Sequence, residues 1–365
     1  MNRVPDIVAF PMSDMDHNQQ ICVGLEQLAA ANEIRLRYRY DGVREYGVQA
    51  KSEYAAVLHV VVARVAGLGD IVFDTHDGPG VQPQYHDRCV AYFKRSYDPI
   101  AHGGMPRVHP LGFNYEVRAD RPSAPALIRA LKLPWSTKSK LRGTLRALHL
   151  PGPHVCSASE LVADRTGPSK NPRILFVART WEPLGFVGIS TAEVQRRTEI
   201  NEMRADCVRG LRKAFGDHFT GGLIRTGHAL QHFADAIVPV GFATDRKSFL
   251  RLVATHDICI STAGLLDSIG WKMAEYVMNG RAVVAERMVY RVPPPFAEGS
   301  HYLKFLSADQ CVAQCARLIG DTALRGAMMQ ANQQYFRDYA VPASLVRNAI
   351  TRAEQPFVEV AGITA

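Results

Sequence analysis

The chain has 365 residues and a mass of 40.4 kDa, a length that exceeds one ordinary hydrophobic core and favours two domains. Hydrophobic residues make up 47% of it and charged residues 21%, which is typical of a globular protein and excludes disordered and fibrous classes. The formal net charge of +8 favours anionic partners, such as a nucleotide, a phospholipid surface or a nucleic acid, without choosing among them.

The sequence carries no signature of a membrane span or of a disulfide framework. No stretch contains the roughly 18 uncharged apolar residues that a spanning helix needs, and the N-terminus lacks a long apolar signal segment. We therefore expect a cytoplasmic location. The seven cysteines are scattered with no C-x-x-C pair, so we expect buried thiols and no structural zinc.

Apolar runs alternate with amphipathic stretches along the first half of the chain, as in βαβ units. The expected elements are strands at 6–11, 34–40 and 70–74, helices at 18–31 and 52–66, a helical or mixed stretch at 85–97 and an extended run at 107–113. The strand at 70–74 ends in a polar turn, 75–80. In a doubly wound sheet this is the edge that faces a ligand.

A second half begins after a polar segment, 164–172, which lacks large apolar residues and marks the expected domain boundary. The alternation then repeats, with strands at 173–179, 222–225, 257–261 and 281–285 and helices at 191–215, 245–255, 269–279, 307–319 and 322–339, before a last helix that starts at Pro342. The sequence thus predicts an α/β protein with two similar lobes.

The most informative segment is 264–285, in the order loop, helix, glycine stop and strand. Ser268 suits the N-cap of this helix, and Gly280 suits the left-handed residue that ends it. The first turn, 268–271, offers backbone N–H groups and the positive end of the helix dipole, which suit a phosphate. This segment is therefore the strongest candidate for a phosphate-binding site.

Two carboxylates flank the start of this helix. Asp267 and Glu275 are eight residues apart and so project on roughly the same side, while Gly270 lets a ligand approach the backbone closely. Carboxylates do not bind phosphate, but they accept hydrogen bonds from hydroxyls such as those of a ribose and a hexose. A nucleotide-sugar combines all of these parts.

The segment resembles the donor-binding motif of GT-B glycosyltransferases, especially the retaining enzymes of glycosyltransferase family 4 (glycosyl transferases group 1). The pattern that carries the resemblance is Asp267-x2-Gly270-x4-Glu275-x4-Gly280-x2-Val283-Val284. The family usually has Glu at the first place, so the shorter Asp267 leaves the identity of the sugar open.

This resemblance implies a GT-B architecture of two Rossmann-like, doubly wound lobes that face a cleft. Residues 1–165 would form the acceptor-side domain and 172–340 the nucleotide-sugar domain, and the helix and tail at 341–365 would cross back to the first domain. The implied activity is transfer of a sugar from a nucleotide-sugar to an acceptor hydroxyl of a glycan, a lipid-linked molecule or a small molecule. The resemblance also implies that the anomeric configuration is retained and that neither a cofactor nor a fixed metal is needed. Metal-dependent enzymes carry a D-x-D triplet at the end of a strand, whereas the only such triplet in this sequence, 14–16, does not stand at a strand end in that manner.

The resemblance also assigns residues to the donor. Asp267 corresponds to the family's acid that holds the sugar, and Glu275 corresponds to the acid that binds the ribose. Arg179, at the end of the strand at 173–179, corresponds to the Arg that neutralises the diphosphate. The remaining donor-binding residues are Ser268, Ile269 and Gly270. The family's Lys five residues after the Arg is absent, since Leu184 stands there; the candidates to replace it are Arg225, Arg246 and Lys247.

In the first lobe, His76 is similar to the family's His that faces the donor sugar. The acceptor-side candidates are Asp14, His17, Asp74 and Asp77. An inverting enzyme would need a general base, and the sequence leaves Asp14, His17 and Asp77 open for that role.

A basic stretch at 129–146 has no acidic residue between its ends. It suits peripheral contact with an anionic membrane or an acidic acceptor, with a solvated helix face as the alternative. Nucleic acid is not expected, because no zinc spacing or aromatic RNA-binding signature accompanies the basic residues. Two other functions remain open: a nucleotide-sugar epimerase of the same fold, and a non-catalytic protein that binds a nucleotide-sugar or glycan.

Overall fold

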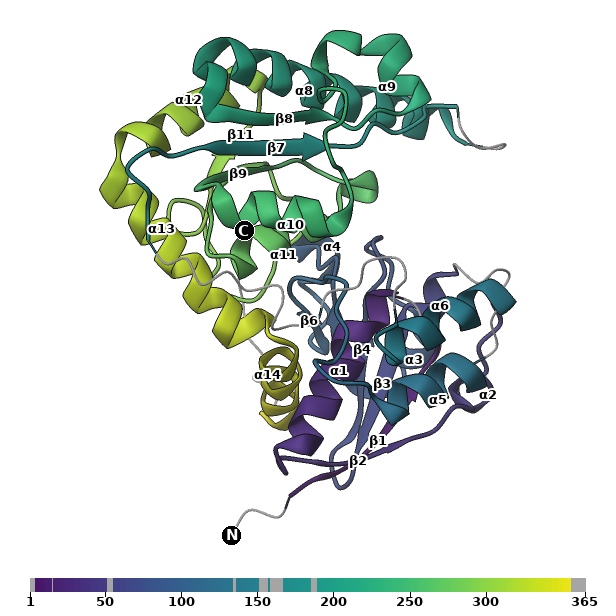
Figure 1. The fold of residues 1–365 in the computed structure, drawn as a ribbon. Coiled ribbons are helices and arrows are strands. Elements are labelled where there is room, and N and C mark those ends of the chain that lie inside the picture. Colours follow the sequence, from purple (N-terminus) through teal and green to yellow (C-terminus); the bar gives the residue numbers. More distant parts are fainter. Residues whose placement is uncertain are drawn as a thin grey trace. The chain divides into compact units, whose positions relative to one another are not determined.

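The computed structural model describes residues 4–14, 16–50, 55–133, 136–150, 157, 167–184 and 189–355. The chain divides into two compact units, each with its own sheet (Figure 1). Unit 1 comprises Met1–Glu160, Tyr290–Pro293 and Arg337–Ala365, and unit 2 comprises Leu161–Val289 and Pro294–Phe336. The expected linker at 164–172 lies partly outside the described residues.

Unit 1 is built on a six-stranded sheet with the order β2-β1-β3-β4-β5-β6. Its strands are β1 (Asp6–Pro11), β2 (Arg35–Tyr38), β3 (Val60–Val65), β4 (Gly69–Asp74), β5 (Cys89–Lys94) and β6 (Val108–Pro110). β3 runs antiparallel to both β1 and β4, whereas the other neighbours are parallel. The carboxyl ends of β4 and β5 therefore lie at the same edge of the sheet.

One sequence prediction for unit 1 is wrong. The helix expected at 52–66 is instead the short 3₁₀ helix η1 (Ala56–Leu58) and strand β3, while 51–54 lie outside the described residues. The run Val60–Val62 is β-branched and fully buried, which favours a central strand. The stretch at 85–97, expected to be helical or mixed, is mixed: it holds the end of a short helix, Pro83–His86, and strand β5.

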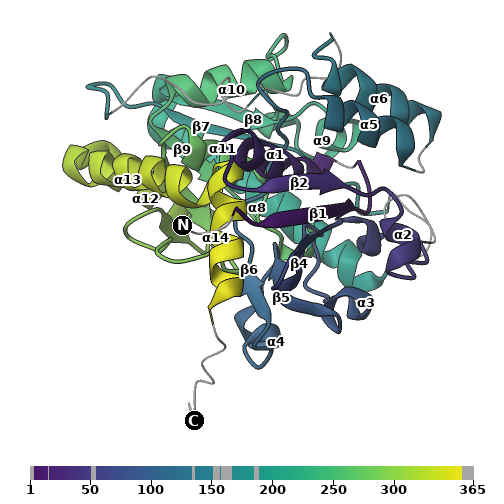
Figure 2. The same ribbon diagram turned by 90° about the horizontal axis from the view of Figure 1, so that it is seen from below.

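The helices of unit 1 are α1 (Asp16–Ala30), α2 (Gly42–Glu45), α3 (Pro83–His86), α4 (Pro99–His102), α5 (Ala124–Lys132), α6 (Thr137–Ala147) and α14 (Pro342–Glu354). The last helix packs against the first, as Figure 2 shows. Leu345 and Val346 of α14 join Ile21 and Leu25 of α1 in one buried cluster with the sheet. The C-terminal helix is thus part of the core of unit 1.

Unit 2 has a five-stranded sheet with the order β11-β10-β9-β7-β8, and every neighbouring pair is parallel. The strands are β7 (Ile174–Ala178), β8 (Phe219–Leu223), β9 (Ile258–Ser261), β10 (Ala282–Glu286) and β11 (Leu303–Phe305). The helices are α8 (Thr191–Phe215), α9 (Gly227–His232), α10 (Arg246–Thr255), α11 (Trp271–Met278), α12 (Ala308–Gly320) and α13 (Thr322–Tyr335). The chain crosses from β7 outward in both directions, so this sheet is doubly wound.

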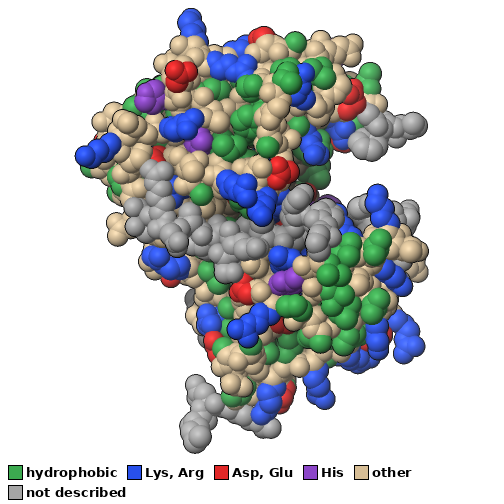
Figure 3. All heavy atoms as spheres, viewed as in Figure 1, with side chains coloured by type: hydrophobic (Ala, Val, Ile, Leu, Met, Phe, Trp, Pro, Cys, Tyr) green, Lys and Arg blue, Asp and Glu red, His purple; other side chains and the backbone are tan. Residues whose placement is uncertain are grey.

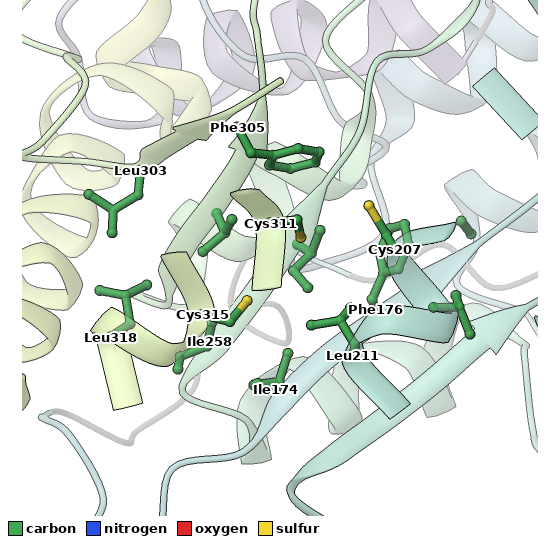
Figure 4. Packing of buried hydrophobic residues seen from close by; sticks show 14 of the residues in the cluster. Ile174, Phe176, Cys207, Leu211, Ile258, Leu303, Phe305, Cys311, Cys315 and Leu318 are labelled. Atoms are coloured by element: carbon green, nitrogen blue, oxygen red, sulfur yellow. The ribbon is translucent and has the colours of Figure 1, made fainter. Parts of the chain in front are cut away.

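The core of unit 2 lies between the sheet and the helices α8 and α12. Phe176 and Ile258 of the sheet and Leu211 of α8 pack there with Cys207 and Cys311 (Figure 4). The six described cysteines are all free and buried, as the sequence predicted. Burial raises the pKa of Cys259, and these thiols act as small apolar side chains.

Candidate functional site

A short 3₁₀ turn, Leu265–Asp267, separates β9 from α11 in unit 2. Two of its residues, Leu266 and Asp267, have φ of 56° and 57°, a left-handed conformation that side chains other than glycine rarely adopt. The Gly264 N–H donates to the carbonyl of Ser268 at 3.0 Å and closes the loop around this turn. The strained turn fixes the direction in which the chain enters α11.

Helix α11 begins two residues later than predicted. Gly270 is its N-cap, with φ −66° and ψ 156°, whereas Ser268 is extended and buried, so the prediction of a Ser268 cap is wrong. Ile269 and Gly270 are partly exposed. A Cβ built on Gly270 would meet nothing within 4 Å, and a ligand can therefore approach the first turn of α11.

Glu275 projects from α11 into the interior. Its side chain is 4% exposed, and Oε1 lies 3.0 Å from Nη2 of Arg246 at the start of α10. Burial raises the pKa of Glu275, while Arg246 and Lys272 oppose the rise. Arg246, one of the three cations that the sequence left open, is thus the partner of Glu275.

Asp267 has different surroundings. It forms an ion pair with Arg196 of α8, and its side chain is 39% exposed. The two carboxylates that the sequence expected on one side are therefore held by cations from two different helices. Of the other open cations, Arg225 and Lys247 are both exposed.

Lys272 is the residue of this region that the sequence analysis missed. It lies on the first turn of α11, and its Nζ donates to the carbonyl of Val177 in β7. Burial lowers the pKa of Lys272 to about 8, with further lowering by Arg204 and Arg179 and opposition by Glu275. The lysine therefore joins the start of α11 to the carboxyl end of β7.

Arg179 follows β7 directly and is exposed. In the described part of the chain no carboxylate forms an ion pair with it. Arg204 of α8 donates to the carbonyl of Arg179 and, at 2.8 Å, to that of Ala263 after β9. Arg204 thereby ties together the two strand ends, and burial lowers its own pKa to about 10.

Arg179 and Lys272 place two cations near each other, where the carboxyl end of β7 meets the first turn of α11. Two positive charges and a helix N-terminus suit an anion with several oxygens, such as a diphosphate. Glu275 lies one turn further along the helix and offers a hydrogen-bond acceptor. The arrangement can therefore bind an anionic group joined to a hydroxyl-bearing one.

In unit 1, three histidines form a row near the carboxyl end of β4. The ring centroids of His17 and His59 are 5.0 Å apart, and those of His59 and His76 are 5.3 Å apart. Burial is the main cause that lowers the pKa of His17 to about 3, of His59 to about 4, and also that of His76. These rings are neutral at pH 7, and each can accept and donate one hydrogen bond.

The carboxylates that the sequence grouped with His76 are tied to cations. Asp74 is fully buried, with Oδ1 3.0 Å from Nζ of Lys94, which is fully buried too. Asp77 is partly exposed and pairs with Arg95. Asp14 is 2.7 Å from Nη2 of Arg146. Asp77, His17 and His76 are partly exposed, whereas the side chain of Asp14 is only 6% exposed.

The buried His59 predicts a loss of stability in acid. Its pKa is about 4 in the folded protein against about 6.5 in a free chain, so below pH 6.5 the unfolded state takes up a proton that the folded state does not. At pH 5 this costs up to about 2 kcal/mol relative to pH 7. We expect His59→Gln to flatten the fall in urea-unfolding free energy between pH 7 and 5, whereas the exposed His218→Gln should leave the slope unchanged. Equal slopes for wild type and His59→Gln would contradict this account.

Among the described residues, no group of three or more His, Cys, Asp or Glu side chains is placed to hold a metal ion. In the same part of the chain, no helix is both long and apolar enough to cross a membrane.

No protein-family model and no curated protein matches the chain. Among solved structures, the C-terminal domain of a glycosyl transferase group 1 family protein (LpcC) from Francisella tularensis is similar to 49% of the chain. The match covers 95% of that domain with 16% identity and a TM-score of 0.35. The similar solved structures include group 1 glycosyltransferases. Anabaena Alr3699/HepE, in complex with UDP and glucose, matches 74% of the chain with 12% identity and a TM-score of 0.36.

A putative UDP-N-acetylglucosamine 2-epimerase from Listeria monocytogenes also matches 74% of the chain, with 12% identity and a TM-score of 0.34. The matches span 65% of HepE and 60% of the epimerase, less than two thirds of either protein. At these identities and scores, the function has to be argued from the residues of the chain itself.

Proposed function

We propose that the protein is a glycosyltransferase that moves a sugar from a nucleotide-sugar to an acceptor hydroxyl. The observation that carries the proposal is that two cations, Arg179 and Lys272, lie near each other at the start of α11, with Glu275 one turn further along the helix. Two cations and a helix N-terminus suit the diphosphate, and the carboxylate suits a ribose hydroxyl. In this proposal Lys272 supplies the second cation that the resemblance places at position 184.

The reaction breaks the bond between the anomeric carbon and the diphosphate oxygen and forms a bond from that carbon to the acceptor oxygen. Negative charge grows on the departing diphosphate, where Arg179, Lys272 and the N–H groups after Gly270 would stabilise it. The acceptor proton leaves on a phosphate oxygen. We propose retention of configuration and a reaction without a fixed metal or a cofactor, as the motif resemblance implies.

Asp267 would hold the donor sugar in this scheme, with Ser268 and Ile269 shaping the approach to Gly270. Asp14, His17 and Asp77 remain our acceptor-side candidates, and His76 remains the residue that the resemblance assigns to the donor sugar. Asp74 is better explained as a structural residue, because its carboxylate is fully buried against Lys94.

A thermal-shift screen of nucleoside diphosphates and nucleotide-sugars tests the proposal. We expect at least one nucleotide-sugar to raise the melting temperature and Glu275→Gln to reduce the shift. Incubation of the bound nucleotide-sugar without acceptor then separates the enzyme classes, because a transferase gives only slow hydrolysis while an epimerase turns the nucleotide-sugar over without an acceptor. A purified, folded protein that binds none of these ligands would contradict the proposal.

We also propose that the helices α5 and α6 rest on an anionic membrane. Figure 3 shows hydrophobic side chains over these helices with Lys and Arg at their border. The exposed apolar residues are Ile128, Leu131, Leu141, Leu148 and Leu150. Of the basic residues at 129–146, Arg129, Arg142 and Arg146 pair with acidic side chains of unit 1, which leaves Lys132, Lys138 and Lys140 for lipid phosphates. Trp135, in the same stretch, lies outside the described residues.

Sedimentation with vesicles that contain phosphatidylglycerol tests this contact. Leu131→Ser combined with Leu141→Ser should weaken binding about tenfold or more, because each leucine loses apolar area that lipid would cover. Ile100→Ser is the matched control, since Ile100 is 94% exposed but lies on α4. Equal binding by all three proteins would exclude this surface.

A further inference from the structure

Unit 2 contains an open cavity of about 450 Å³, and no residue of α11 is among its described lining residues. It lies between the chain after β7, one face of α8 and the short helix α9. Its polar lining includes Glu182, Asn201, Glu202, His228 and His232, and Phe233 supplies an apolar wall. None of the residues discussed above as donor ligands lines it.

The charge of the lining determines which ligands fit. The described lining residues include two carboxylates and no Lys or Arg, although the whole chain carries a net charge of +8. A phosphate or carboxylate ligand would meet only like charge there. Glu182 is largely exposed, so its oxygens are accessible from solvent. The cavity therefore favours a ligand that donates hydrogen bonds without bringing negative charge.

Asn201 fixes the geometry of the floor. It is fully buried, with Oδ1 2.8 Å from the Trp181 N–H and Nδ2 2.7 Å from the Trp181 carbonyl. The same Nδ2 lies 3.3 Å from Nε2 of His228, which makes that ring nitrogen the acceptor. Nδ1 of His228 then carries the proton and points toward Glu182, 3.7 Å away.

Three rings cluster beside these acceptors, tilted against one another by 41° to 67°. The centroids of His228 and His232 are 4.6 Å apart, and the ring of Phe233 lies 5.9 Å from that of His228. Rings of this kind pack against the apolar C–H face of a pyranose, while carboxylates accept from its hydroxyls. A mostly apolar pocket with a few directed polar groups is also the usual form of a small-ligand site.

We propose that this cavity binds an uncharged sugar residue. Glu182 and Glu202 accept hydrogen bonds from its hydroxyls, and the His232 and Phe233 rings cover one face of it. None of the residues proposed to bind the donor lines the cavity, so sugar binding there can be tested independently of the transfer reaction. It gives the protein a contact with a glycan that needs no diphosphate.

Saturation-transfer NMR on the purified full chain tests the proposal. The probes are the methyl glycosides of glucose, galactose, mannose and N-acetylglucosamine. We expect at least one of them to bind, and Glu202→Gln and Phe233→Ala each to weaken it fivefold or more. Gln231→Ala is the matched control, because Gln231 is an exposed residue of α9 that does not line the cavity.

Each alternative outcome gives a definite answer. A sugar signal that survives Glu275→Gln but is lost in Glu202→Gln supports the cavity even if no nucleotide-sugar binds. The proposal is overturned if no methyl glycoside binds, if glucose 6-phosphate binds as tightly as the neutral sugars, or if only protonated glucosamine or a nucleoside binds. It is also overturned if folded Glu202→Gln and Phe233→Ala proteins bind as the wild type does.

Discussion

Lys272→Met should lower kcat for sugar transfer by about 10²–10³, with a much smaller change in the affinity for the donor. Lys272 reaches the carboxyl end of β7 beside Arg179, where our proposal places the departing diphosphate. Methionine keeps most of the length of the lysine side chain but not its charge, so the loss falls on the transition state. Steady-state kinetics with the nucleotide-sugar found by the screen measure kcat and KM separately.

The pKa of Lys272 gives this prediction a second readout. Because that pKa is about 8, the ammonium loses its proton as the pH rises through this value. The kcat/KM of the wild type should therefore fall above about pH 8, since this parameter reports on groups of the free enzyme. Lys272→Arg should keep activity and lose this alkaline limb, because a guanidinium stays charged.

Lys213→Met is the matched control, as Lys213 is exposed on α8. A folded Lys272→Met protein with unchanged kcat would remove this lysine from the mechanism and leave Arg179 as the only cation proposed there.

The sequence alone predicted unit 2 well. The helix expected at 191–215 coincides with α8, and the strands expected around 257–261 and 281–285 correspond to β9 and β10. These elements are flanked by strong local signals: Ser190 caps α8 with its side chain, and Gly280 ends α11 with φ of 57°. Local chemistry determines such boundaries, so one sequence suffices to find them.

The partners of the site residues could not be predicted in this way. Lys272 meets β7 across 95 positions of sequence, and no spacing rule connects them. The spacing of Asp267 and Glu275 predicts that they share one face of a helix. In the structure, however, Leu266 and Asp267 have left-handed backbone conformations, and Asp267 forms an ion pair with Arg196. A pattern that assumes regular helix geometry cannot anticipate that turn.

The antiparallel strand β3 was missed for a related reason. A run of apolar residues such as 60–65 fits a buried helix or a buried strand equally well in periodicity. Its direction depends on β1 and β4, which pair with it on either side. His59 precedes this strand and became part of the histidine row only through that topology.

The largest stability effect should come from the buried ion pair between β4 and β5. Lys94 and Asp74 are both fully buried with 3.0 Å between Nζ and Oδ1. Asp74 also accepts from the hydroxyl of Tyr92 and, at 2.9 Å, from the N–H of His76. Lys94→Met would leave a buried carboxylate without its counter-charge, which typically costs about 3–5 kcal/mol.

Native-state hydrogen exchange of the β4 and β5 amides measures this cost for unit 1 by itself. Lys94→Met should accelerate exchange by the factor that corresponds to the lost free energy of unfolding. Lys132 is an exposed lysine of the same unit, so Lys132→Met should leave the exchange rates unchanged. Combining Lys94→Met with Asp74→Asn removes the uncompensated charge, so the double variant should be more stable than Lys94→Met alone. A double variant as unstable as the sum of the two single changes would mean that the pair is not coupled.

Because Asp74 accepts a hydrogen bond from the backbone N–H of His76, loss of the pair should also displace the row of His17, His59 and His76. The acid sensitivity assigned to His59 should then decrease as well.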